Sequence, residues 1–385
     1  MRSHAHPFLL LLVLSAVGPS LVSAQGQRVD LTQAPTLRLH VPFSRVGDLL
    51  PIGEEQLLVT DVLERELLLI NLETQSRVAV GNQGGGPGEW RNLSRLLRGP
   101  AGSAILVDAG KRAIHQISTD GRLRSSIPWP VVPGEPVGGV PIGADAQGAM
   151  VVRGSGFGET GPLDSVQLSR WEPATGLLIP LASVPNPARS DKAVAASGGL
   201  VLRRGSGRPM ESRELLVALP DGGVARILPA PFRVDKLDTR GMVKIGDELD
   251  FQRVPVSRAD RQAWRDGQER QSTSVGSING GGQAVRLPAP SIRDEDFPAT
   301  LPPFLANARV ISDPEGRVWI PRVMPAGSRV QDWDVVVPGA GRVEVAEAGI
   351  GSVLMAVTSS AIFLVRVDEA TGLQYVEKHR RSRKR

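Results

Sequence analysis

One pattern occurs twice in the sequence, first as Asp61-Val62-Leu63-Glu64-Arg65-Glu66-Leu67-Leu68-Leu69-Ile70 and, 47 positions later, as Asp108-Ala109-Gly110-Lys111-Arg112-Ala113-Ile114-His115-Gln116-Ile117. The two copies place Asp61 on Asp108 and Arg65 on Arg112. A short apolar run precedes each copy and a polar turn follows it, which is typical of a strand, a turn and a second strand. A repeat of this period that is built from strands predicts the blades of a propeller.

Further strands are expected on either side of the repeat. The first two blades should cover residues 46–80 and 93–129. Turns that contain glycine, at 144–148, 219–223 and 314–317, predict strands of later blades, because glycine supplies the positive φ that reverses an antiparallel strand. The alternating runs 165–171, 232–237 and 332–337 are predicted to be the outer strands of their blades.

The two ends of the chain are predicted to complete one blade together. Residues 36–41 alternate apolar and polar side chains, and residues 374–378 form a second strand-like run near the other end. An open ring would leave unpaired strand edges, so a propeller is usually closed in this way. The polar residues 25–35 that precede the first of these runs are expected to be loose.

One segment breaks the β pattern. Ser257 and Asp260 are spaced as a capping box, which predicts a short helix over Arg261–Arg270, inserted between blades. Residues 271–303 are rich in Gly, Ser and Pro and are expected to form a long loop. The predicted fold class is therefore all-β, a β-propeller with a short inserted helix.

The amino terminus has the features of a targeting segment. Arg2, His4 and His6 precede the apolar run 8–17, and small residues at 22–24 offer a cleavage site before Gln25. Residues 1–24 are predicted to be a secretory signal peptide, with an uncleaved anchor as the alternative, and the mature protein is expected to be secreted or periplasmic. The predicted domains are this signal peptide, a propeller over 36–379 and a basic tail over 380–385. No transmembrane segment is expected after removal of the signal.

Composition limits the chemistry that the protein can use. The chain has no cysteine, so disulfides, thiolate metal sites and thiol nucleophiles are excluded. Its net charge is +5, but six basic residues lie among the last eight, so the remainder carries 5 − 6 = −1. A body without net positive charge predicts no nucleic-acid partner.

The joint between the two copies resembles a known loop. Residues Gly84-Gly85-Gly86-Pro87-Gly88-Glu89-Trp90 are similar to the Gly-x-Gly-Pro-Gly-Glu-Phe loop of bacterial secreted six-bladed β-propeller proteins, a group related to the NHL-repeat propellers. The stretches 255–257, 297–304, 313–319 and 368–379 resemble the same group in the same order. The resemblance implies six blades and a secreted location, and it transfers no catalytic residue. Trp90 departs from the group, which usually has phenylalanine there.

Four residues are candidates for a ligand-binding site. Glu89 and Arg91 follow the glycine-rich loop and could face the central channel of the propeller, although the loop lacks the Gly-Lys-Ser/Thr and helix of a phosphate-binding loop. In the alternative interpretation the loop is a tight crossing between blades, with Trp90 filling the space between two sheets. Asp61 and Asp108 are equivalent in two blades and could take part in a calcium site, or each could pin its turn by pairing with the arginine four residues later.

Two classes of function remain open at this point. The chain is predicted to be an exported scaffold or binding protein, with a small molecule, a glycan or an envelope protein as its partner. The alternative is a metal-assisted hydrolase or lyase. The sequence predicts no catalytic residue and indicates no cofactor, and calcium would need carboxylates that converge across blades. An enzyme should bring several carboxylates or histidines together in the channel.

Overall fold

The computed structural model describes residues 27–135, 138–158, 161–186, 192–197, 200–204, 208–272 and 292–381. The predicted signal peptide, residues 1–24, and most of the predicted long loop lie outside these ranges. Within the described ranges, strands form six sheets of four or more strands.

The first three sheets follow one another along the chain. They consist of β3–β6 (Val46–Ile52, Gln56–Asp61, Glu66–Asn71 and Arg77–Ala79), β9–β12 (Leu93–Arg98, Ala104–Asp108, Ala113–Ile117 and Leu123–Pro128), and β13, β14, β17 and β18 (Val140–Ala144, Met150–Arg153, Ser165–Glu172 and Leu177–Pro185). The predicted first and second blades are confirmed, since each begins within one residue of its predicted start.

The last three sheets complete the set. They consist of β21–β24 (Leu215–Ala218, Val224–Pro229, Phe232–Leu237 and Val243–Lys244), β25–β28 (Ile311–Ser312, Val318–Pro321, Val330–Val336 and Arg342–Gly349) with β1 (Gln27–Asp30), and β29–β31 (Ser352–Val357, Ala361–Val367 and Gln374–Arg380) with β2 (Leu37–Arg38). Two short pairs follow a blade and precede the next, formed by β7–β8 (Asn82–Gln83, Glu89–Trp90) and β19–β20 (Lys192–Ser197, Leu200–Arg204). A third pair, β15–β16 (Phe157–Gly158, Gly161–Pro162), lies within the third blade, between β14 and β17.

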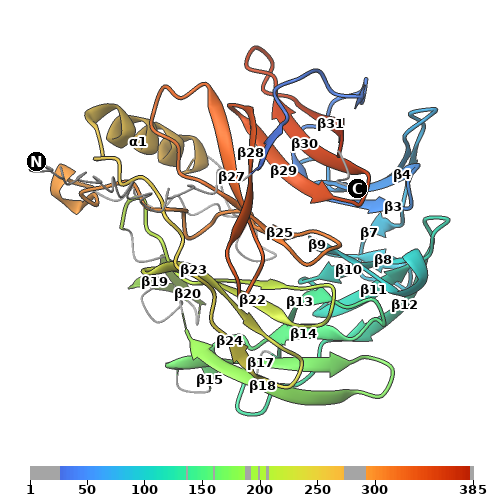
Figure 1. The fold of residues 1–385 in the computed structure, drawn as a ribbon. Coiled ribbons are helices and arrows are strands. Elements are labelled where there is room, and N and C mark those ends of the chain that lie inside the picture. The colour runs from blue at the N-terminus through green and yellow to red at the C-terminus, as the bar shows by residue number, and fades with distance from the viewer. Residues whose placement is uncertain are drawn as a thin grey trace, which may run out of the picture.

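The sheets are arranged in a closed ring. The innermost strands β3, β9, β13, β21, β25 and β29 each contact the next, and β29 contacts β3. Figure 1 shows the sheets following one another around a centre, from the blue β3 and β4 through green β13 and β14 to the red β29–β31. The chain is a six-bladed β-propeller. Because every blade begins with its innermost strand, these six strands all run in the same direction, and their first residues lie at one end of the central channel.

The runs predicted to be outer strands are in fact third strands. β17, β23 and β27 each have a fourth strand outside them, namely β18, β24 and β28. The third strand is largely buried because neighbouring blades cover both of its faces, whereas residues of the fourth strand, such as Leu177, are exposed. The sequence pattern of the third strand is therefore easier to recognise than that of the fourth strand outside it.

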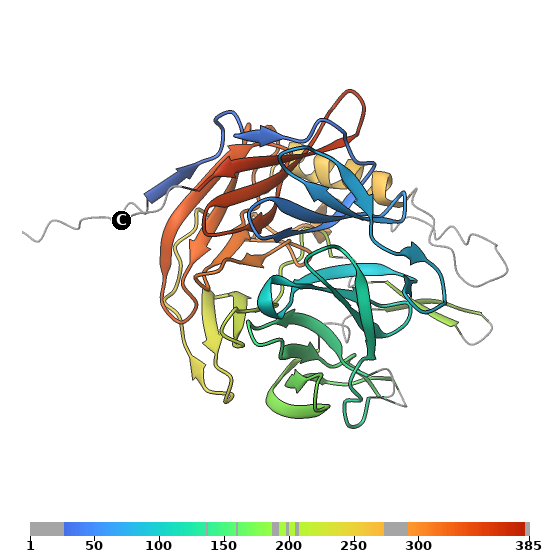
Figure 2. The same ribbon diagram turned by 90° about the vertical axis from the view of Figure 1, so that its right-hand side faces the viewer.

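The amino-terminal segment closes the ring, as predicted. In β2, Leu37 pairs with Lys378 of β31 and Arg38 with Glu377, so β2 becomes the outer strand of the sixth blade. The preceding segment was expected to be loose, but β1 pairs in parallel with β28 as a fifth strand of the fifth blade. Leu31 fixes it there, because its side chain is buried and its N–H donates to Glu347 O (2.7 Å). Figure 2 shows these dark blue strands beside the orange and red blades.

The carboxyl-terminal boundary lies later than predicted. β31 continues to Arg380, and the Arg381 guanidinium contacts the buried Asp313 carboxylate (2.8 Å). The propeller therefore extends past residue 379, and its last described residue is held to the fifth blade.

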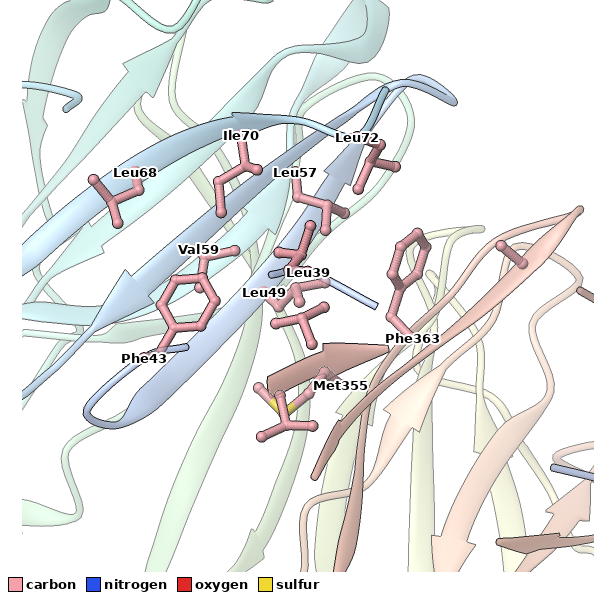
Figure 3. Close-up of a cluster of buried hydrophobic side chains, with 13 residues drawn as sticks. Leu39, Phe43, Leu49, Leu57, Val59, Leu68, Ile70, Leu72, Met355 and Phe363 are labelled. Atoms are coloured by element: carbon pink, nitrogen blue, oxygen red, sulfur yellow. The ribbon is translucent and has the colours of Figure 1, made fainter. Parts of the chain in front are cut away.

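The core consists of layers between neighbouring blades. Six clusters of buried apolar side chains occupy the described part of the molecule between successive blades. In the layer shown in Figure 3, Leu57 and Ile70 of the first blade face Met355 and Phe363 of the sixth. Trp90 fills the layer between the first two blades, where it packs near Leu58 and Leu106 and is 2% exposed. The predicted role of Trp90 as a plug between sheets is confirmed.

The predicted inserted helix is present as α1 (Arg258–Ser272), between the fourth and fifth blades. Its capping box is confirmed: the Ser257 N–H and hydroxyl donate to the Asp260 carboxylate (2.7 and 2.6 Å), and the Asp260 N–H donates to Ser257 Oγ (3.1 Å). Trp264 packs on a small apolar cluster that includes Val256, Phe297 and Leu301. None of the helices in the described ranges is long and apolar enough to cross a membrane.

Candidate functional site

The predicted site carboxylates Asp61 and Asp108 anchor turns. Asp108 accepts four backbone N–H bonds, from Arg91 (2.8 Å), Asn92 (2.9 Å), Gly110 (2.9 Å) and Lys111 (3.1 Å). Asp61 accepts the same four bonds from the residues 47 positions earlier, which are Ser44, Arg45, Leu63 and Glu64. Both side chains are buried. The repeat in the sequence therefore corresponds to an identical hydrogen-bond pattern in two blades.

The partner predicted for these acids is wrong. No ion pair joins Asp61 to Arg65 or Asp108 to Arg112 in the described part of the chain. Both arginines instead have left-handed backbone conformations, with φ of 57° and 50°. Burial opposes ionisation of Asp108, but the N–H donors of Arg91, Asn92 and Lys111 outweigh it, and the pKa of this carboxyl lies below its ordinary value.

Glu89 and Arg91 belong to the same crossing between blades. The Glu89 carboxylate accepts the N–H of Gly86 (2.6 Å), and Lys111 Nζ donates to the carbonyl oxygens of Gly86 (2.8 Å) and Glu89 (2.7 Å). Gly88 has the positive φ expected of a tight turn, 73°. The Arg91 side chain is exposed, while its N–H is the donor to Asp108. These contacts bring Arg91 and Asp108 together and support the interpretation of the loop as a structural crossing.

The principal cavity lies elsewhere, along the axis of the propeller. Its volume is about 1090 Å³, and residues of all six innermost strands line it. Its lining does not include Asp61, Glu89, Arg91 or Asp108. Several innermost strands carry β-bulges that face this space, at Gly47, Ser94, Ile142 and Met355. Bulges often redirect side chains beside binding sites.

Charged side chains gather where the innermost strands begin. Asp48 and Arg95 are the third residues of β3 and β9, and Arg213 and Arg309 each lie two residues before the start of β21 and β25. Arg153, at the end of β14, pairs with Val140, the first residue of β13. All five line the cavity. Because the innermost strands start at one end of the channel, these residues share that end, which we call the arginine end.

Five carboxylates line the cavity in the described ranges, and all of them except Glu211 form the ion pairs with arginines given below. Asp48 forms an ion pair with Arg309. The other pairs are formed with arginines outside the cavity lining: Asp145 with Arg170 (2.6 Å), Glu214 with Arg226 (2.8 Å), and Asp313 with Arg317 and Arg381 (both 2.8 Å).

Two arginines at the same end have no carboxylate partner within the described residues. Arg95 reaches across to the third blade, where its Nη1 donates to the carbonyl oxygen of Ile142 (2.9 Å). The Arg153 side chain forms no hydrogen bond or ion pair in these ranges, and its Nε is buried without a partner. In the first two blades, Asp61 and Asp108 pair with the first residue of the innermost strand. In the third blade, Arg153 occupies the equivalent position, so an arginine stands where two other blades have an aspartate.

Both enclosure and repulsion from other arginines at this end lower the pKa values of Arg153 and Arg95. Enclosure by the protein lowers the pKa of Arg153, repulsion from Arg95 and Arg213 lowers it further, and Glu135 only partly opposes these effects. Enclosure also lowers the pKa of Arg95, the neighbouring Asp48 raises it, and Arg309 lowers it. Arginine stays protonated at neutral pH despite such shifts. The arginine end therefore holds positive charges that repel one another.

The sequence alone did not reveal this cluster. Its members come from segments far apart in the chain, and the negative balance of the remaining body hides a local excess of positive charge. One signal was available: the offset of 47 that matches Asp61 with Asp108 also matches Asp48 with Arg95, and both face the channel. Among the described residues, no group of three or more His, Asp or Glu side chains is placed to hold a metal ion.

Comparisons with known proteins extend no further than the fold. No protein-family model matches the sequence, and no curated protein does. Among solved structures, a provisionally named exported protein of Bacteroides fragilis is 10% identical with a TM-score of 0.47, and the match covers 92% of this chain and 99% of that one. A provisionally named gluconolactonase is 12% identical with a TM-score of 0.45, covering 92% and 97%. The calcium-binding protein regucalcin of Agrobacterium tumefaciens is 10% identical with a TM-score of 0.40, covering 92% and 96%. At these values the likenesses carry neither activity nor ligand to this chain.

Proposed function

We propose that this propeller is an exported binding protein that takes up a small molecule in its central channel. The observation that carries the proposal is the axial cavity, whose volume of about 1090 Å³ is slightly above the range of roughly 300–1,000 Å³ that is usual for ligand pockets. A glycan chain or an envelope protein, the other expected partners, would bind mainly outside this space. Export follows from the predicted signal peptide.

The alternative, a metal-assisted hydrolase or lyase, makes a different demand on the channel. It needs carboxylates or histidines that are free to converge on one metal ion. Four of the five carboxylates that line the channel in the described ranges are instead held by arginines, namely Asp48, Asp145, Glu214 and Asp313; the fifth is Glu211. This arrangement favours binding over hydrolysis, and calcium is kept in the test as the ion that would serve the alternative.

The test is a thermal-shift screen of the purified mature protein against small metabolites, mono- and oligosaccharides and calcium, followed by calorimetry. A ligand that binds only the folded protein stabilises it, so a ligand present at 100 times its Kd should add about 2.7 kcal/mol to the free energy of unfolding. Binding of a small molecule that is abolished by Ser94→Trp would support the proposal, because this residue is exposed in the wall of the cavity. Stabilisation by calcium alone, with turnover of a lactone or an ester, would contradict it.

Export is checked separately by mass spectrometry of the secreted protein. The predicted cleavage after Ala24 places Gln25 at its amino terminus. An intact Met1 in the membrane fraction would show that the segment is an anchor.

A further inference from the structure

We infer that the ligand of the channel is a small organic anion with at least two negative charges, of the carboxylate or phosphate type, held between Arg95 and Arg153. The inference rests on the proposed function and adds the chemical class of the ligand. Its basis is a pair of arginines at one end of the cavity, Arg95 and Arg153, for which the described residues supply no carboxylate partner.

Neither Arg95 nor Arg153 has a carboxylate partner among the described residues. Asp48 lies close enough to Arg95 to affect its pKa, and Arg309 already holds the Asp48 carboxylate. Asp48 also accepts the Leu96 N–H (2.8 Å) and the Leu49 N–H (2.9 Å), so both of its oxygens are engaged. Glu135, which lies near Arg153, accepts hydrogen bonds from Ser155 Oγ (2.8 Å) and the Gly156 N–H (2.9 Å). Within the described residues, neither Asp48 nor Glu135 forms an ion pair with Arg95 or Arg153.

These two arginines are electrostatically unfavourable for folding. Arg95 and Arg213 repel Arg153, which is half-buried, so water screens this repulsion less than it would on an open surface. Arg153 also replaces a turn anchor that two other blades supply with a well-bonded aspartate. A residue that is unfavourable for folding and placed in a cavity has the character of a binding group.

The chemistry of arginine indicates the class of ligand. A guanidinium presents a planar fork of N–H donors that matches a carboxylate or a phosphate. A ligand with one negative charge would leave one of the two repelling arginines uncompensated. A ligand with two charges would compensate both and would relieve their repulsion, so citrate and a sugar phosphate are suitable probes of this class.

The experiment compares four variants with the wild-type mature protein by calorimetry, using citrate, glucose 6-phosphate and glucose. Arg95→Gln and Arg153→Gln remove the proposed contacts, and Arg153→Lys keeps the charge without the fork. Arg98→Gln is the matched control, since Arg98 also lines the channel without a carboxylate partner in the described ranges but lies at the last residue of β9, toward the opposite end.

The inference predicts that citrate and glucose 6-phosphate bind and that glucose does not. Arg95→Gln and Arg153→Gln should each weaken anion binding by about tenfold or more, Arg153→Lys should weaken it less, and Arg98→Gln should leave it unchanged. Binding should also weaken as salt is raised. Without ligand, Arg153→Gln should raise the melting temperature, because it removes a repulsive charge; a merely structural arginine would lower it.

Each other outcome overturns the inference in a recognisable way. Binding of glucose with no effect of either anion would leave the proposed function standing and would refute the anion class. Anion binding that depends on Arg98 and is unaffected by Arg95→Gln and Arg153→Gln would place the ligand elsewhere and refute the site. Failure of all three probes to bind, together with a negative metabolite screen, would refute both proposals.

Discussion

At the scale of single residues, one carboxylate in each of the first two blades organises a whole turn. Asp108 joins the loop that enters its blade, through Arg91 and Asn92, to the turn that follows its own strand, through Gly110 and Lys111. Hydrogen bonds to a buried charged acceptor are among the stronger ones in proteins. A single carboxylate therefore holds these two segments together through four hydrogen bonds.

Replacing this carboxylate should be costly. Asp108→Asn keeps the size of the side chain but substitutes an N–H₂ group for one acceptor oxygen, so at least one backbone N–H loses its partner. We expect a loss of about 2–3 kcal/mol in the free energy of unfolding, measured by urea denaturation at pH 7. Asp120→Asn, at an exposed turn, is the control and should change stability by less than about 0.5 kcal/mol.

The same substitution should change the dependence of stability on pH. The pKa of Asp108 is lower in the folded protein than its ordinary value of 3.8, so its contribution is complete above pH 3.8 and is lost as the pH falls below that value. The difference in stability between the wild type and Asp108→Asn should therefore shrink in acid. A difference that stays constant between pH 7 and pH 3 would show that the charge of Asp108 is not what stabilises the turn.

At the scale of structural elements, the ring depends on the short strand β2. It supplies the outer edge of the sixth blade and is hydrogen-bonded to β31, near the opposite end of the chain. β1 has a different role, because it adds a fifth strand to a blade that already has four. The two strands are close in sequence, yet only β2 closes the ring.

Truncation separates these roles. Starting the mature chain at Gln33 removes β1, which should lower the melting temperature but leave one cooperative transition. Starting it at Pro42 also removes β2 and exposes the edge of β31, and this variant should lose cooperative unfolding in calorimetry. A chain that starts at Pro42 and melts as sharply as the longer one, at the same temperature, would contradict the role given to β2.

Sequence patterns predicted the parts of this fold that depend on local contacts. The first two blades, the capping box of α1 and the burial of Trp90 follow from neighbouring residues, and the structure confirms them. The outer strands were misassigned because burial, rather than position in the sheet, determines how apolar a strand is. β1 was missed because its polar sequence gives no alternation and its pairing with β28 is made with a segment more than 300 residues away.

At the scale of the whole molecule, the propeller brings side chains from distant segments to one end of its axis. Arg95, Arg153, Arg213 and Arg309 span more than half of the chain length, and no local pattern relates them. They share one end of the channel because the blades close into a ring, and their spacing in the sequence does not reveal this. The predicted site residues were local and proved to anchor turns or a crossing, whereas the cluster that lines the cavity depends on the complete ring.

The most direct test of this account is an anomalous diffraction experiment on crystals of the mature protein soaked in sodium selenate, a dianion of the proposed charge. The account predicts an anomalous peak in the axial cavity beside the guanidinium groups of Arg95 and Arg153, and no such peak in crystals of Arg153→Gln. Selenate bound only on the outer surface or beside Arg98, with the arginine end empty, would contradict it.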